Sequence, residues 1–204
     1  MQQNSTPTLI PIKNALDLRK WDQYIEANCS RKIHTYFLLG LDLGLLPTFL
    51  LTLKWDDIKL EKKGNLIGKV EPYILMPSKI QNEPRKFYFN DRTLAALDKL
   101  RSENPDDIYI FQNSYRNSKK DKPAPMTSRY ISSCLSDAAK KSQITLPGDV
   151  GAVTLRKCFG YHHLVHGDWS LHEMMRYFEQ RSLSFTKHYL DITDEKIMIR
   201  RPEK

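Results

Sequence analysis

The sequence predicts an α+β fold that is mostly helical and contains a small antiparallel β-sheet of about three strands. Apolar residues recur at helical spacing near the N-terminus and again through the second half of the chain. Between these regions, residues 58–89 hold short β-like runs separated by glycine and proline. Hydrophobic residues make up 40% of the 204 residues and aromatic residues 10%, which is enough for a folded core.

Helices are expected ahead of the sheet. The first runs from residue 14 to about residue 27, where Leu18 and Trp21 lie on one apolar face. A second, more apolar helix is expected over residues 31–45. Pro47 begins a third helix, because proline is tolerated in a first helical turn, where its missing N–H costs nothing.

The sheet and the later helices follow in order. The β-like runs are residues 58–60, about 67–70, 73–76 and 85–89. The next helix is capped by Asn90 or Asp91, because such side chains accept hydrogen bonds from the first free N–H groups. Residues 114–125 are expected to form an exposed basic loop. Further helices are expected over residues 127–141, 154–166, 170–178, 182–190 and 194–200.

Charge and composition limit the partners of this chain. A net charge of +8 and a pI near 9.3 favour a polyanionic partner such as nucleic acid, although ordinary solubility charge is the alternative. The cysteines Cys29, Cys134 and Cys158 form no CxxC pair, so they predict neither a disulfide framework nor a zinc site. The apolar runs are shorter than the ~20 residues that cross a bilayer, and no signal peptide is evident. The sequence therefore predicts a soluble, intracellular protein with no membrane partner.

Several motifs in order resemble one family. Residues 37–58, FLLGLDLGLLPTFLLTLKWDDI, resemble the tyrosine-recombinase (phage integrase) box Gly-Leu-Arg, an acidic residue, then Leu-Leu-x-Leu-x-Trp-x-Asp-Ile. TLRKCFGYHHL at residues 154–164 resembles the His-x-Leu-Arg box, and FEQRSLSFTKHYLDI at residues 178–192 resembles the box that ends in Thr-x-x-Tyr. Pro77-Ser78-Lys79 before the run 85–89 resembles the family's catalytic hairpin. The resemblance implies an integrase-like catalytic domain.

The resemblance also implies a chemistry. Family members cut DNA with a tyrosine and form a 3′-phosphotyrosyl link, while arginines bind the nonbridging phosphate oxygens and a lysine protonates the leaving 5′-oxygen. By this resemblance Tyr189 is the nucleophile, Arg156 the second arginine and Lys79 the hairpin lysine. Considered one at a time, each residue has a purely structural interpretation. Tyr189 could be a buried aromatic residue, Arg156 a salt-bridge partner and Lys79 a solvated lysine. Their ordered occurrence is what favours the functional interpretation.

Other catalytic positions depart from the family's pattern. Leu46 stands at the first arginine, Val153 at the histidine before Arg156, and Gln180 at the later histidine. The neighbouring acidic position holds Phe49. Because aliphatic side chains bind no phosphate, the sequence favours a degenerate active site and a protein that is not an enzyme.

DNA binding does not depend on those positions, because affinity comes from many phosphate contacts whereas cleavage needs a few residues in strict geometry. No cofactor and no metal is expected, since His162, His163 and His166 lack carboxylate or cysteine partners at ligand spacing. The expected partner is double-stranded DNA. The candidate DNA-contacting residues are Arg129, Lys157, Arg181, Lys187, Lys119, Lys120, Lys122 and Arg85.

Three functions remain open at this point. The first is a sequence-specific DNA-binding regulator or accessory factor of a mobile element or phage, in the bacterial cytoplasm and associated with the nucleoid. The second is an atypical but active site-specific recombinase that uses Tyr189, and the third is a protein-interaction scaffold without DNA binding. We expect a flexible tail over residues 1–8 and one domain over residues 9–204, without the family's N-terminal core-binding domain. Residues 194–200 are a candidate helix for homo-oligomer formation.

Overall fold

A computed structural model describes residues 9–62, 70–78, 80, 82–114, 122–146, 148–167 and 169–193. The expected tail 1–8, the hairpin residue Lys79, most of the basic loop and the expected helix 194–200 lie outside these ranges. The helices are α1 (Ala15–Asn28), α2 (Arg31–Leu43), α3 (Pro47–Thr52), α4 (Asp91–Glu103), α5 (Ser128–Lys141), α6 (Ala152–Val165), α7 (Leu171–Tyr177) and α8 (Leu183–Leu190). The strands are β1 (Lys59–Lys62), β2 (Val70–Met76) and β3 (Arg85–Tyr88).

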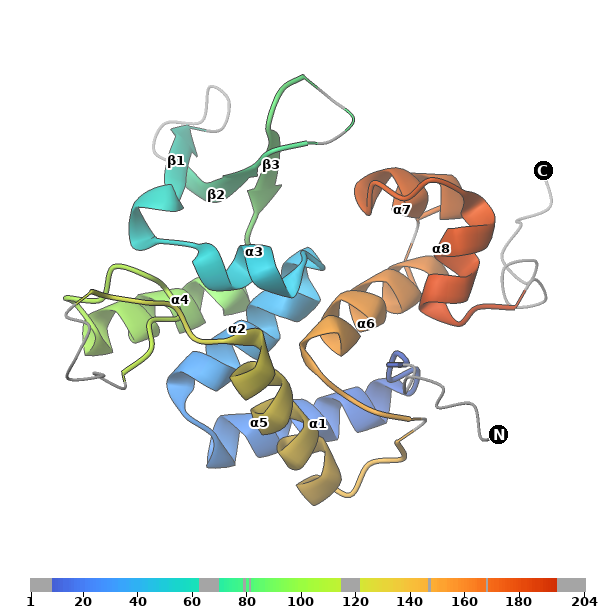
Figure 1. Cartoon of the computed structure of the whole chain (residues 1–204), viewed down its shortest axis with the longest axis horizontal. Helices are drawn as coiled ribbons and strands as arrows, with labels where there is room; N and C mark the ends of the chain where they lie inside the picture. Colours follow the sequence, from blue (N-terminus) through green and yellow to red (C-terminus); the bar gives the residue numbers. More distant parts are fainter. Residues whose placement is uncertain are drawn as a thin grey trace.

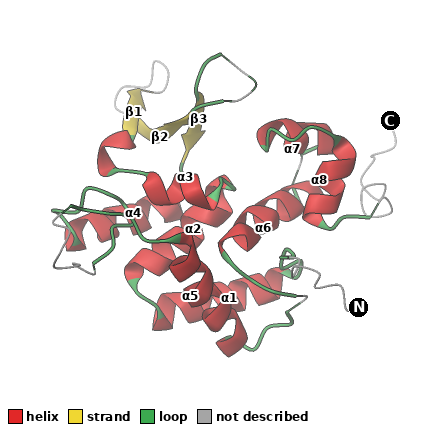
Figure 2. Ribbon diagram, in the orientation of Figure 1, coloured by secondary structure: helices red, strands yellow, loops and turns green. Residues whose placement is uncertain are grey.

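The predicted fold class is confirmed. Helices surround the apolar helix α2, and the strands form one small sheet beside α3, at an edge of the molecule (Figure 1). Figure 2 shows that strand is confined to this edge among the described residues. In the described part of the chain, no helix combines the length and the apolar character that a membrane span requires.

Local side chains set where the helices begin. Asn14 caps α1 by accepting from the N–H of Leu16, and Asn90 caps α4 by accepting from the N–H of Thr93. Thr127 caps α5 in the same way, through the N–H of Tyr130. The predicted starts of these helices therefore agree with the structure to within a residue.

Two of the helix boundaries differ from the prediction by two residues. Helix α2 ends at Leu43 rather than residue 45, because Gly44 adopts a left-handed conformation with φ of 54°. A Cβ atom at Gly44 would lie 2.3 Å from the ring of Phe159, so glycine also allows α6 to approach closely. Helix α6 begins at Ala152, two residues before the predicted start at Thr154.

The sheet is antiparallel in the order β1-β2-β3. Ile74 of β2 lies opposite Phe87 of β3, and both side chains are buried against the helices. Tyr73 and Tyr88 form the next pair and lie on the other face, as strand alternation requires. Arg85 at the start of β3 donates to the carbonyl of Tyr177 in α7, so the β2–β3 hairpin lies beside the C-terminal helices.

The core has two parts. The main cluster is centred on α2, which packs against α1, α3, α4, α5 and α6. A smaller cluster joins the C-terminal half of α6 to α7 and α8, and it includes Phe159, Met174, Phe178 and Leu190. Helices α7 and α8 are therefore anchored chiefly through α6, which brings the segment with Tyr189 next to the segment with Arg156.

Candidate nucleic-acid interface

Arg156 and Tyr189 are the predicted site residues that the fold brings together. Arg156 lies on α6 and Tyr189 on α8, and the guanidinium of Arg156 is close enough to the phenol of Tyr189 to influence its pKa. Burial raises the pKa of Tyr189, although Arg156 opposes that shift. The phenol is therefore protonated at neutral pH.

The guanidinium of Arg156 is turned into the protein. Its Nη1 donates to the carbonyl of Gly44 at 2.6 Å, and its Nη2 donates to the carbonyl of Phe178 at 3.2 Å. The group also stacks 3.9 Å from the centre of the Phe178 ring. Only 6% of Arg156 is exposed, and this burial lowers its pKa. The side chain links three segments of the fold, so it has a structural role.

Aromatic and cationic groups enclose Tyr189. The Nζ of Lys157 lies 4.7 Å from the centre of the Tyr189 ring, and the Phe178 ring meets it edge-on with centroids 5.9 Å apart. On the outer side Phe185 stacks at 6.3 Å and is itself 55% exposed. These neighbours partly cover Tyr189. Such packing fits the alternative interpretation of Tyr189 as a buried aromatic residue on a C-terminal helix.

The departures from the family's pattern lie at the edge of this cluster. Leu46 precedes α3 and is 44% exposed, only two residues from the carbonyl that Arg156 contacts. Val153 lies in the first turn of α6 and is half-buried. The Oε1 atom of Gln180 is buried and has no hydrogen-bond partner within the described residues. None of these side chains supplies a cation at the surface.

Two of the predicted DNA contacts are bound to groups inside the protein. Lys157 is 8% exposed, and its Nζ donates to the carbonyl of Leu9 at 2.6 Å. Arg85 donates to the carbonyl of Tyr177 at 2.8 Å and stacks 4.9 Å from the Tyr177 ring. Nothing in the sequence indicated that these side chains are engaged inside the protein, because their partners are distant along the chain. In this structure their charges are used inside the protein.

The other predicted DNA contacts divide by position. Arg129 lies at the start of α5, Arg181 lies just before the N-cap residue of α8, and Lys187 lies within α8. Arg129, Arg181 and Lys122 are exposed, whereas Lys187 is half-buried. Both α5 and α8 pack on α6, so these basic residues flank one helix. Lys79, Lys119 and Lys120 lie outside the described residues.

Sequence reasoning missed a pocket between the hairpin and α7. It has a volume of about 730 Å³, and its lining includes Ser78, Arg85, Arg176 and Glu179. Ser78 and Glu179 are 101 residues apart, and no local pattern signals their contact. Across the described ranges, no group of three or more His, Cys, Asp and Glu side chains is placed to hold a metal ion.

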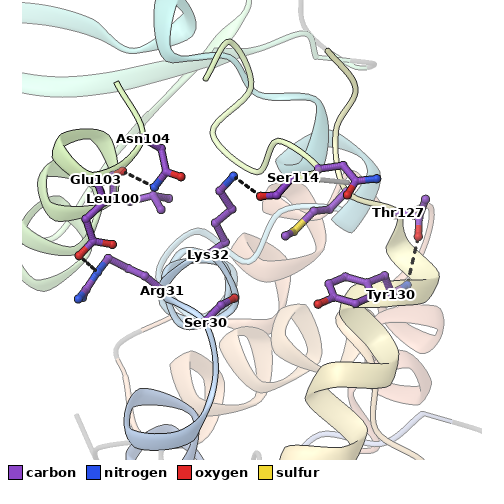
Figure 3. Close-up of a pocket in the computed structure, with 11 residues that line it drawn as sticks. Ser30, Arg31, Lys32, Leu100, Glu103, Asn104, Ser114, Thr127 and Tyr130 are labelled. Atoms are coloured by element: carbon purple, nitrogen blue, oxygen red, sulfur yellow. Dashed lines mark hydrogen bonds and ion pairs between the residues drawn. The ribbon is translucent and has the colours of Figure 1, made fainter. Parts of the chain in front are cut away.

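A second pocket of about 700 Å³ lies at the N-terminal end of α2 (Figure 3). Lys32 points toward it, but its Nζ is bound to Asp107 at 2.6 Å and faces Ser114 at 3.4 Å. Arg31 pairs with Glu103 at 2.6 Å across the same opening. This pocket is at the opposite end of α2 from Gly44, and the cations among its described lining residues, Arg31 and Lys32, are paired with Glu103 and Asp107. It is separate from the cluster around Arg156.

No protein-family model matches the chain, and no curated protein matches it. Solved structures do match. The structure of XerA recombinase superposes with a TM-score of 0.69 at 16% identity, covering 98% of this chain and 68% of that chain. The structure of XerH site-specific recombinase bound to palindromic difH substrate, a post-cleavage complex, gives a TM-score of 0.67 at 16% identity. The match covers 97% of this chain and 54% of that chain. A lambda integrase dimer bound to a COC' core site gives a TM-score of 0.62 at 17% identity. The match covers 100% of this chain and 53% of that chain.

These likenesses establish the fold. The chain has the architecture of the catalytic domains of tyrosine recombinases and integrases, as the ordered motifs predicted. It spans between about half and two thirds of the length of these solved proteins.

Proposed function

We propose that this chain is a DNA-binding protein with the integrase fold that does not recombine DNA. Its role is that of a sequence-specific regulator or accessory factor of a mobile element or phage. The observation that carries this proposal is the inward direction of Arg156. A guanidinium whose nitrogens are bound to the carbonyls of Gly44 and Phe178 is not presented to a phosphate.

The energetic argument against catalysis follows from the same cluster. Removing one donor that stabilises transition-state charge costs about 3–4 kcal/mol. Here the first arginine is replaced by the exposed Leu46, and Arg156 is engaged internally. Losses within one catalytic unit do not add simply, but either one is enough to slow cleavage severely.

DNA binding is supported by charge and by the kind of complex in which this fold is found. The solved XerH and lambda integrase structures are complexes with DNA. This chain has a net charge of +8, and Arg129 and Arg181 are exposed beside the same helix. Such basic residues bind phosphates without needing the geometry that cleavage demands.

An atypical recombinase is the second candidate, and the contact between Arg156 and Tyr189 is what favours it. A nicked duplex that traps a covalent intermediate separates the two candidates. We expect no covalent adduct with the wild-type protein. An adduct that disappears in Tyr189→Phe would establish the recombinase instead.

Binding itself is tested by fluorescence anisotropy with a labelled duplex at several salt concentrations. We expect Arg129→Gln to weaken binding and to reduce the slope of log K against log salt by about 1. Arg19→Gln is the matched control, because Arg19 is exposed on α1. Salt-insensitive or absent binding would refute the DNA-binding proposal and favour a protein-interaction scaffold.

A further inference from the structure

The contact between the hairpin and the α7–α8 turn has a chemistry of its own. The Oγ of Ser78 donates to Oε1 of Glu179 at 2.6 Å, and Nη1 of Arg85 lies 3.8 Å from the same oxygen. The side chain of Glu179 is 9% exposed and that of Arg85 is 17% exposed. A carboxylate on one segment is thus held by a hydroxyl and a guanidinium on another.

The same donors suit a phosphodiester. Serine hydroxyls and arginine guanidinium groups are the usual partners of DNA phosphate oxygens, and a carboxylate offers the same kind of anionic oxygen. The adjoining pocket of about 730 Å³ leaves room for a phosphate group beside them. Arg176 lies on the lining of that pocket and is exposed, so it adds a second cation.

Backbone hydrogen bonds hold the turn at Glu179: its N–H donates to the carbonyl of Arg176 at 3.0 Å, and the N–H of Gln180 donates to the carbonyl of Met175 at 2.9 Å. The φ of Glu179 is 52°, in the left-handed region that residues other than glycine and asparagine seldom adopt. Such a conformation persists only when the surrounding contacts hold it. Since these backbone bonds do not involve the carboxylate, displacing it frees the donors of the hairpin while the turn stays in place.

We propose that Ser78 and Arg85 form a phosphodiester subsite, which the carboxylate of Glu179 occupies in the DNA-free protein. DNA must displace Glu179 to use this subsite, so the contact lowers affinity until the hairpin and the turn separate. This inference rests on the proposed DNA-binding function. Arg85 also donates to the carbonyl of Tyr177, which positions its guanidinium beside Ser78 and Glu179.

The test compares Glu179→Gln with Glu173→Gln. Glu173 lines the same pocket, so both changes remove one negative charge from one place. Glutamine at position 173 also preserves the capping box with Ser170. The probe is a fluorescein-labelled random-sequence duplex, titrated by anisotropy at several salt concentrations, and circular dichroism checks that each variant is folded.

We expect Glu179→Gln to bind more tightly than Glu173→Gln, with a salt slope larger by about 0.9, the value of one added phosphate contact. The gain should disappear in the double variant Arg85→Gln/Glu179→Gln. If Glu179→Gln weakens the fold, Glu179→Asn provides the same release, because asparagine tolerates the left-handed conformation at this position, and it should give a gain of the same sign.

Each outcome separates the two proposals. Binding by the wild-type protein with no advantage of Glu179→Gln over Glu173→Gln overturns the subsite and leaves the DNA-binding function standing. A gain that persists without Arg85 also overturns it. If only Glu179→Gln binds DNA, the subsite is supported, and the carboxylate of Glu179 blocks DNA binding by the wild-type protein. If no variant binds DNA, both proposals are refuted.

Discussion

Replacing Arg156 by methionine is expected to destabilise the fold, with a smaller effect on DNA affinity. The change removes the hydrogen bonds to Gly44 and Phe178, and a hydrogen bond from a charged donor contributes about 1.5–3 kcal/mol. Stacking on the Phe178 ring at 3.9 Å adds about 1–2 kcal/mol. Removing a buried charge offsets part of this loss. The expected decrease in the free energy of unfolding is therefore about 3 kcal/mol.

Urea denaturation followed by tryptophan fluorescence measures this decrease. DNA affinity is measured in parallel without urea, where the variant is still folded. Arg181→Met is the matched control, because Arg181 is exposed in the turn between α7 and α8, close in sequence to Phe178. This control should change the free energy of unfolding by less than about 0.5 kcal/mol. The structural role of Arg156 is refuted if Arg156→Met is as stable as the wild-type protein but loses DNA binding.

Three further changes test separate parts of the structure. Leu46→Arg should not restore cleavage of the nicked duplex, because the positions of the family's histidines still hold other residues; a covalent adduct in this variant would contradict that. Tyr36→Phe should leave the free energy of unfolding unchanged or raise it by up to about 1 kcal/mol, since the fully buried hydroxyl has no hydrogen-bond partner within the described residues; a marked loss in urea denaturation would reveal a hidden partner. Burial raises the pKa of Asp22, but hydrogen bonds from His34 and Arg92 outweigh this effect, so its pKa lies below the ordinary value. The ionised carboxylate of Asp22 therefore stabilises the fold above about pH 4, and this contribution is lost as the pH falls through the lowered pKa. In Asp22→Asn the free energy of unfolding should fall less steeply as the pH is lowered below about 4. An unchanged decrease would show that other carboxylates dominate.

Local features of this chain were readable from the sequence because their causes act over a few residues. The caps at Asn14, Asn90 and Thr127 form hydrogen bonds within the first helical turn. The β-like runs at residues 73–76 and 85–89 are bounded by Pro77 and Pro84, because proline interrupts the pairing of strands. The ordered motifs then indicated the architecture that the solved recombinase and integrase structures share.

The use of the charged side chains depended on contacts between distant segments. Arg156 and the carbonyl of Gly44 are 112 residues apart, and Lys157 and the carbonyl of Leu9 are 148 apart. A sequence pattern identifies a basic residue and its place on a helix, but the free energy of its charge depends on the dipoles and ions that surround it after folding. The sequence by itself thus determined the fold class, the cap of α4 and the order of the helices and strands along the chain. Only the tertiary structure decided that Arg156, Lys157 and Arg85 turn inward, because their partners come together only when the chain is packed.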